Sequence, residues 1–245
     1  MKYNEKEILV FDNIEKIIDH AVEKWIEVAE QSVKEKEIFT AALSGGRTPV
    51  LLHKALSEKK GLPWYRTHIF IVDERFVPFD HEDSNFLMIQ NTLLKHVLIP
   101  SENIHPVQTE NSTPVLSAEK YEKEMLSFFN ISENEFPRFD LILLGIGEDG
   151  HTASLFPGTP VLNETRHLAA AVTQSVKPGK ERVTLTFPAI NNAKNIILMA
   201  TGGDKAAAIR EVIEEDSSLP AAMVRPERGK LLFLLDKDAA SLLSR

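Results

Sequence analysis

Residues 139–158, FDLILLGIGEDGHTASLFPG, predict a strand that is followed directly by a polar loop. Leu141 to Leu144 form a continuous aliphatic run, which is the pattern of a strand buried on both faces of a parallel sheet. The loop that follows carries Glu148, Asp149 and His151. Open α/β sheets bind ligands beyond the carboxyl ends of their strands. We therefore expect the chemistry of the protein at this loop.

Three glycines within residues 145–150 also match the G-x-G-x-x-G pattern of a dinucleotide-binding turn. Such a turn opens a long helix that receives the pyrophosphate, but a Pro-Gly pair at residues 157–158 interrupts any helix here after barely two turns. Glu148 and Asp149 would repel phosphates, and the next strand-like run, 167–172, ends without the acidic residue that binds ribose. The pattern therefore disfavours a nicotinamide or flavin cofactor.

Composition indicates a single large α/β domain spanning residues 1–245, since 43% of the residues are hydrophobic. Cysteine is absent, so neither disulfides nor a catalytic thiolate are available. No run approaches the roughly 20 apolar residues that span a bilayer, and the first residues lack a signal-peptide core. A net charge of -8 disfavours nucleic acid as a partner. We expect a cytoplasmic protein with neither membrane nor nucleic-acid partners.

Helical and strand-like patterns alternate along the chain. Helices are expected at 13–36, 49–58, 84–96, 117–129 and 204–214, and strands at 38–43, 68–72, 141–144, 167–172, 182–187, 195–200 and 231–235. This alternation predicts an α/β, Rossmann-like fold with a mostly parallel sheet and helices on both faces. Residues 103–113 are the most loop-like stretch.

A glycine turn follows the first expected strand. Backbone amides at Gly45 and Gly46, with the hydroxyls of Ser44 and Thr48, would cradle a phosphate at the start of a helix. The segment lacks the G-x-x-x-x-G-K-[ST] spacing of a nucleoside triphosphate loop. An ordinary tight turn between strand and helix is the alternative.

A second polar group, Asp73-Glu74-Arg75, follows the strand expected at 68–72. Three consecutive charged residues after a strand are often only a solvated loop. The functional interpretation is that Arg75 neutralises an oxyanion or carboxylate while the neighbouring carboxylates orient it.

The remaining candidates lie in the second half of the chain. Imidazole titrates near neutrality, so His151 is suited to general-base catalysis, and Asp149 would fix its tautomer. Arg182 and Lys205 would both bind a phosphate. Taken singly, however, an Arg or a Lys at such a position is more often an ordinary surface residue. All these clusters follow or adjoin strands and would converge at one edge of the sheet.

Other chemistries lack their motifs. The chain has no G-x-S-x-G elbow, and its eight histidines show no H-x-x-x-H or H-E-x-x-H spacing. We therefore expect no metal site and no cofactor, and chemistry in which water is the nucleophile.

Together these segments resemble the glucosamine-6-phosphate deaminase/6-phosphogluconolactonase family over nearly the whole chain. The resemblance rests on LSGGRTP at 43–49, VDERFVP at 72–78, SN at 84–85, LLGIGEDGHTASLFPG at 143–158, RVTLTFPAIN at 182–191 and TGGDKA at 201–206. It implies the fold shared by glucosamine-6-phosphate deaminases, ribose-5-phosphate isomerases and CoA transferases. Arg75 after Asp-Glu, and the sequence that follows His151, are similar to the lactonase branch; a deaminase-like phosphosugar enzyme is the alternative.

The resemblance implies hydrolysis of 6-phosphoglucono-1,5-lactone in the oxidative pentose phosphate pathway. In that reaction His151 would deprotonate water, Asp149 would orient His151, and Arg75 with the Gly45-Gly46 amides would stabilise the oxyanion. Thr48, Arg182 and Lys205 would hold the phosphate of the substrate, with Ser44 serving phosphate or oxyanion. A non-catalytic phosphosugar sensor would have no need of the His151 loop.

Overall fold

The computed structural model describes residues 6–173 and 181–244 of the chain. Its central element is a seven-stranded sheet in the order β1-β10-β9-β6-β2-β3-β5, in which every pair of neighbours is parallel. The strands are β1 (Lys6–Phe11), β2 (Phe39–Leu43), β3 (Thr67–Ile71), β5 (Ile104–His105), β6 (Leu141–Gly145), β9 (Asn195–Ala200) and β10 (Lys230–Asp236). The expected mostly parallel sheet is confirmed.

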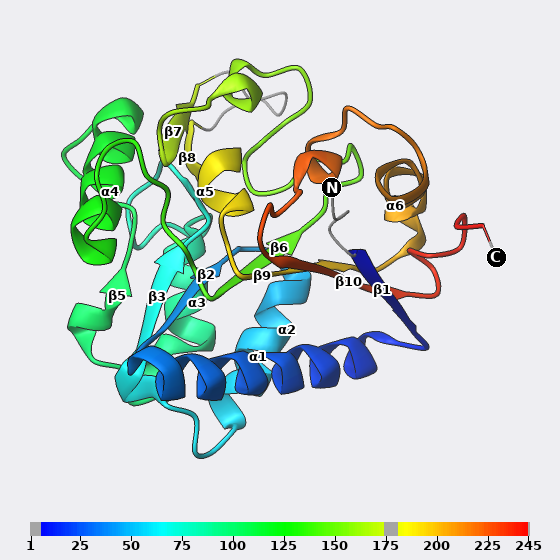
Figure 1. The fold of residues 1–245 in the computed structure, drawn as a ribbon, viewed down its shortest axis with the longest axis horizontal. Coiled ribbons are helices and arrows are strands. Elements are labelled where there is room, and N and C mark those ends of the chain that lie inside the picture. The colour runs from blue at the N-terminus through cyan, green and yellow to red at the C-terminus, as the bar shows by residue number, and fades with distance from the viewer. Residues whose placement is uncertain (1–5, 174–180, 245) are drawn as a thin grey trace.

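Helices cover both faces of this sheet, as the alternation predicted (Figure 1). They are α1 (Ile14–Lys36), α2 (Arg47–Glu58), α3 (Asn85–Thr92), α4 (Pro114–Phe129), α5 (Phe187–Asn191) and α6 (Ala206–Glu214). Helix α1 places seven residues of one stripe in the interior, among them Ile17, Ala21 and Trp25, as its helical spacing predicts. In the view of Figure 1, α1 and α2 lie below the sheet, and α5 and α6 lie above it.

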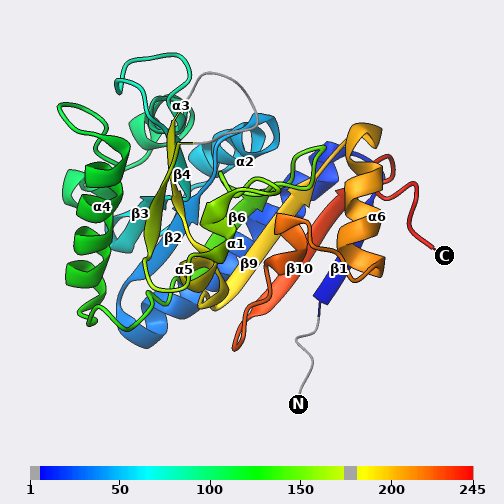
Figure 2. The same ribbon diagram turned by 90° about the horizontal axis from the view of Figure 1, so that it is seen from above.

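A second, smaller sheet is antiparallel and joins β4 (Asp73–Arg75), β8 (Arg182–Leu185) and β7 (Ala169–Val172) in that order. The strands expected at 167–172 and 182–187 therefore do not extend the large sheet. A parallel connection needs a crossover of a dozen or more residues, and the chain between β7 and β8 is too short for one. Helix α4 packs on this small sheet (Figure 2).

Strand β1 had no counterpart in the sequence prediction. Most of its residues are exposed or half-buried, and it lies at the edge of the large sheet beside β10. Its sequence, KEILVF, contains an apolar run of only four residues, and a run this short does not by itself identify a strand. Only the pairing with β10 defines it.

The large sheet brings three polar loops to one edge. Strands β2, β6 and β9 are neighbours, so the residues after them, 44–46, 146–158 and 201–205, leave the sheet side by side. Strand β3 continues almost directly into β4 of the small sheet. The glycine turn, the His151 loop and the arginine-bearing strands are thus placed at the same carboxyl edge.

Candidate active site

The glycine turn after β2 is shaped by close packing. Gly46, at φ 113°, precedes the first turn of α2, and this backbone conformation favours glycine. A Cβ on Gly45 would lie 1.9 Å from the Asn85 side-chain oxygen. The Ser44 hydroxyl is buried and donates a hydrogen bond to the Leu143 carbonyl at 2.8 Å. Its proton therefore ties β2 to β6, while the backbone amides at the start of α2 remain as anion donors.

Thr48 connects the glycine turn to the loop after β9. Its hydroxyl oxygen lies 3.1 Å from that of Thr201. The Gly202 amide donates to the Asp236 carboxylate at 3.0 and 3.1 Å, which fixes the loop that leads to Lys205. The structure thus places Thr48, in the first turn of α2, beside the loop that leads to Lys205. Among the described residues, no hydrogen bond or ion pair joins Lys205 to Arg182.

His151 and Asp149 form a close pair in the loop after β6. The distance from His151 Nδ1 to Asp149 Oδ1 is 2.5 Å, and the same oxygen accepts from the His151 amide at 3.2 Å. Burial raises the pKa of Asp149, but hydrogen bonds and the charge of His151 outweigh it and leave the pKa below its ordinary value. With Nδ1 donating to an ionised carboxylate, Nε2 of the neutral imidazole is the proton acceptor, and it has no hydrogen-bond partner among residues 6–173 and 181–244.

Arg75 and Arg182 face each other across β4 and β8, in register. Arg75 Nη1 donates to the Asp83 carbonyl at 2.7 Å. The Nε atoms of both arginines are buried and have no hydrogen-bond partner within the described residues. Burial lowers the pKa of Arg182, the Arg75 charge lowers it further, and Asp73 opposes both effects. Two adjacent guanidinium groups with unused donors suit an anionic ligand.

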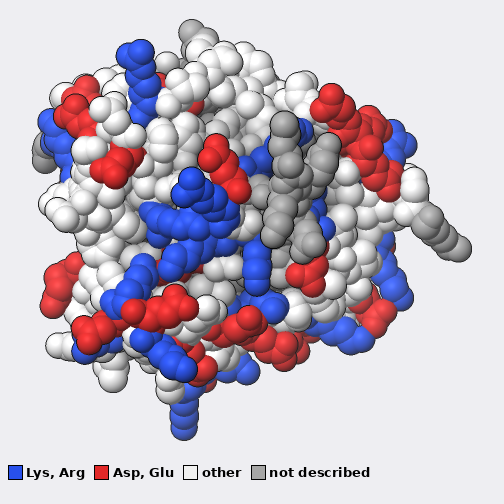
Figure 3. Space-filling model, in the orientation of Figure 1, with Lys and Arg blue, Asp and Glu red and all other residues white. Residues whose placement is uncertain are grey.

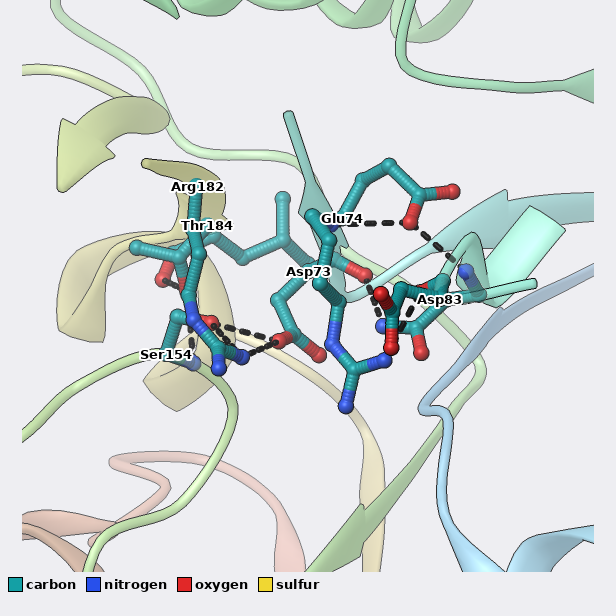
Figure 4. A network of polar contacts seen from close by, with 9 residues as sticks. Asp73, Glu74, Asp83, Ser154, Arg182 and Thr184 are labelled. Atoms are coloured by element: carbon teal, nitrogen blue, oxygen red, sulfur yellow. Dashed lines mark hydrogen bonds and ion pairs between the residues drawn. The ribbon is translucent and has the colours of Figure 1, made fainter. Parts of the chain in front are cut away.

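The ring of Phe156 links the arginine pair to the histidine. The Arg182 guanidinium carbon lies 5.3 Å from the ring centroid of Phe156, and the His151 ring centroid lies 4.5 Å from it. The sequence analysis did not single out Phe156, although it is part of the motif at 143–158. Nor did it identify Ser154, whose hydroxyl donates to Asp73 at 2.6 Å (Figure 4).

Glu74 is buried beside Arg75 rather than solvated, and it holds the start of α3. Its carboxylate accepts from the backbone amides of Arg75, Asn85 and Phe86 at 2.7–2.8 Å. Burial raises its pKa to about 6, although these three hydrogen bonds act in the opposite direction. The Asp73-Glu74-Arg75 group is therefore part of the interior of the site and not an ordinary surface loop.

The surface carries both signs of charge. On the face in Figure 3, a group of Lys and Arg side chains lies near the centre with Asp and Glu side chains around it. Within residues 6–173 and 181–244, His, Asp and Glu form no group of three or more that would hold a metal ion. No helix in the described part of the chain is long and apolar enough to cross a membrane.

Comparisons with known proteins agree with this arrangement. The family model for glucosamine-6-phosphate isomerases/6-phosphogluconolactonase matches residues 12–233. The chain is 44% identical to a 6-phosphogluconolactonase of Nostoc, over 87% of this chain and 88% of that protein. A Thermotoga maritima 6-phosphogluconolactonase structure superimposes with a TM-score of 0.84 at 34% identity, covering 95% of this chain and 100% of that one. The Trypanosoma cruzi enzyme gives 0.88 at 30%, covering 100% and 99%. The chain therefore belongs to the glucosamine-6-phosphate isomerase/6-phosphogluconolactonase family.

Proposed function

We propose that the protein hydrolyses 6-phospho-D-glucono-1,5-lactone to 6-phospho-D-gluconate, a step of the oxidative pentose phosphate pathway. The curated relatives at 42–44% identity carry the name 6-phosphogluconolactonase. The observation that carries the proposal is the His151-Asp149 pair, whose histidine ring contacts Phe156; the guanidinium of the half-buried Arg182, which lies opposite Arg75, contacts the same ring. Such a site offers a general base, His151, and a pair of cations, Arg75 and Arg182, which we call the anion clamp. Hydrolysis of a lactone by water requires both a base and a group that stabilises negative charge.

The mechanism begins at the free nitrogen of His151. Nε2 takes a proton from water as the oxygen attacks the lactone carbonyl, and Asp149 stabilises the imidazolium that forms. Arg75 and the backbone amides of the Gly45-Gly46 turn stabilise the tetrahedral oxyanion. When the intermediate collapses, the bond from carbon to the ring oxygen breaks, and the imidazolium returns its proton to that oxygen. The reaction consumes one water and needs no electron transfer.

The phosphate of the substrate is held by Thr48, Arg182 and Lys205 in this proposal. Thr48 lies at the start of α2, where unpaired amides and the helix dipole favour an anion. Arg182 supplies a planar guanidinium with an unused Nε donor. Ser44 contributes through the shape of the turn, because its hydroxyl already donates to Leu143. Binding at the phosphate would position the carbonyl for attack.

The substrate, the absence of nucleic-acid and membrane partners, a single domain spanning 1–245 and a cytoplasmic location all belong to this proposal. The substrate is the part that can be tested directly. A lactone that opens spontaneously also sets the background against which the enzyme must be measured.

The test follows the lactone by NMR. 6-Phosphogluconolactone is generated from glucose 6-phosphate, the generating enzyme is removed, and lactone loss is recorded with wild type, with His151→Ala and with His167→Ala. His167 is a matched control because it also pairs with a carboxylate, that of Glu122 at 3.3 Å. We expect rapid loss with wild type and His167→Ala, and loss near the spontaneous rate with His151→Ala. No acceleration by folded wild type would overturn the proposal and make glucosamine 6-phosphate the next substrate to test.

A further inference from the structure

Ser154 joins three parts of the site although it lies in the loop that carries His151. Its hydroxyl donates to the Asp73 carboxylate on β4 at 2.6 Å, and its amide donates to the Thr184 hydroxyl on β8 at 3.2 Å. Arg182 Nη1 also lies 3.4 Å from the same hydroxyl oxygen. Figure 4 shows these side chains converging from the loop and the two strands. Ser154 is fully buried, so it does not contact the substrate itself.

The backbone next to Ser154 is held in an unfavourable conformation. Ala153 has a φ of 52°, in the left-handed region where a Cβ is disfavoured. Such a backbone conformation persists only when contacts on both sides of the residue hold the loop in place. Before it, the Thr152 hydroxyl donates to the Gly145 carbonyl at 2.8 Å; after it comes the bond from Ser154 to Asp73. The conformation of the loop therefore depends on a contact with β4, which is distant in sequence.

Asp73 in turn serves two neighbours at once. The same oxygen, Oδ2, accepts from Ser154 and lies 4.0 Å from Arg182 Nη1. Only 5% of Asp73 is exposed, so its carboxylate interacts with protein groups rather than with water. A single buried carboxylate thus contacts both the histidine loop and the strand that bears Arg182.

We propose that Asp73 and Ser154 are positioning residues that lock the His151 loop against the Arg182 strand, so that the base and the anion clamp keep a fixed separation. This inference rests on the proposed function for its kinetic consequences. Neither residue is a catalytic residue, since both act through His151 and Arg182. Small displacements of reacting groups, of about 1 Å, can lower turnover by roughly 10²-fold.

A double-mutant cycle tests the lock. Ser154→Ala removes the donor, Asp73→Ala removes the acceptor, and the double variant removes both. We expect each single variant to lower kcat by roughly tenfold or more. The kcat of the double variant should be close to that of the less active single variant, because the effects of groups that act as a unit are not additive. Multiplying effects in the double variant would overturn the proposal. If Ser154→Ala does not fold, Ser154→Cys replaces it, since a thiol fills the space but donates only weakly.

Thr40→Val is the matched control for loss of stability. The Thr40 hydroxyl also donates to a buried carboxylate, Asp140 Oδ2, at 2.8 Å, but it lies at the start of β2 on the opposite edge of the sheet. We expect Ser154→Ala and Thr40→Val to lower the melting temperature by comparable amounts, with kcat reduced only in Ser154→Ala. Equal losses of kcat in the two variants would show a general effect of destabilisation and contradict the lock.

A readout without substrate separates this inference from the proposed function. The His151 ring lies on Phe156, so the chemical shift of its Hε1 proton reports the position of the loop. We expect this resonance to move in Ser154→Ala and Asp73→Ala and to stay in place in Thr40→Val. An unchanged resonance in both site variants would overturn the lock. A moved resonance in a protein that does not hydrolyse the lactone would support the lock while the proposed function fails.

Discussion

Arg75 and Arg182 occupy directly opposite positions on the antiparallel strands β4 and β8. Opposite residues project from the same face of a sheet, so two cations are held side by side. Each retains a buried Nε donor without a partner in the described part of the chain. Like charges in this position are unfavourable unless an anion neutralises them. Asp73, whose Oδ2 lies 4.0 Å from Arg182 Nη1, offsets part of this charge, and in the proposed function the anionic groups of the substrate offset the rest.

Replacing the two arginines is expected to change different kinetic parameters. Arg182→Ala should raise KM for the lactone by roughly tenfold or more, since a charge-assisted hydrogen bond to phosphate contributes about 1.5–3 kcal/mol. Arg75→Ala should mainly lower kcat, because its partner exists only in the transition state. Steady-state kinetics check this, with the exposed Arg166→Ala as control. The reverse division, with Arg75 acting on KM and Arg182 on kcat, would interchange the two assignments.

Asp149→Asn should lower kcat by roughly tenfold or more while KM changes little. The amide cannot stabilise an imidazolium, and it permits the tautomer in which Nε2 carries the proton. Glu122→Gln is the control, because Glu122 pairs with His167 in a similar way. Turnover in Asp149→Asn equal to that of wild type would remove Asp149 from the mechanism.

Gly147→Ala should impair turnover while Gly145→Ala should not. A Cβ on Gly147 would lie 2.1 Å from His151 Nδ1 and 2.7 Å from Asp149 Oδ1, whereas a Cβ on Gly145 would meet nothing within 4 Å. The alanine at 147 must therefore push the histidine and the carboxylate apart. Comparing kcat and melting temperature of the two variants checks this, and equal kcat values would contradict it.

Glu74 should make the protein less stable as pH rises from 4.5 to 6. Its pKa is raised to about 6 in the folded protein from 4.5, so the folded state binds the proton more tightly. That contribution is complete below pH 4.5 and is lost through pH 6, a change of about 2 kcal/mol in the free energy of unfolding. Because the buried His53 has the opposite effect over this range, the measurement is the difference between the two proteins: denaturant titrations should show Glu74→Gln gaining about 2 kcal/mol relative to wild type as pH rises from 4.5 to 6. The same slope in both proteins would assign it to another group.

His53 should act in the opposite direction. It is fully buried in α2 without a hydrogen-bond partner for either ring nitrogen among the described residues, and burial lowers its pKa from 6.5 to about 3. Its contribution is therefore complete above pH 6.5 and falls by about 1.4 kcal/mol for each unit of pH below that. Urea unfolding of His53→Leu should lack this loss.

The exposed His96→Gln is the control for His53 and should behave as wild type. Between pH 4.5 and 6 the slopes from Glu74 and His53 oppose each other, so wild type alone would conceal both. The test is therefore the difference between His53→Leu and wild type, and an identical pH dependence of stability in the two proteins between pH 6.5 and 4.5 would show that His53 does not titrate on unfolding.

Much of the fold follows from patterns of short range. Buried runs such as residues 141–144 predict parallel strands because both faces of each strand are covered, and the confirmed strands β2, β3, β6, β9 and β10 are of this kind. The antiparallel sheet of β4, β7 and β8 was not predicted, because alternation along the chain does not say which strands pair. Strand β1 was missed because its apolar run is only four residues long and lies at an exposed edge, where pairing with β10 rather than burial defines the strand.

The candidate site divides in the same way. The sequence by itself determined the His151-Asp149 pair, two residues apart, and the glycine turn at 45–46, because local backbone geometry brings these groups together. Only the tertiary structure decided that Ser154 meets Asp73, 81 positions away, and that Arg182 lies opposite Arg75. Those contacts depend on the register between strands of a separate sheet, and register is fixed by packing of the whole chain rather than by any segment of it.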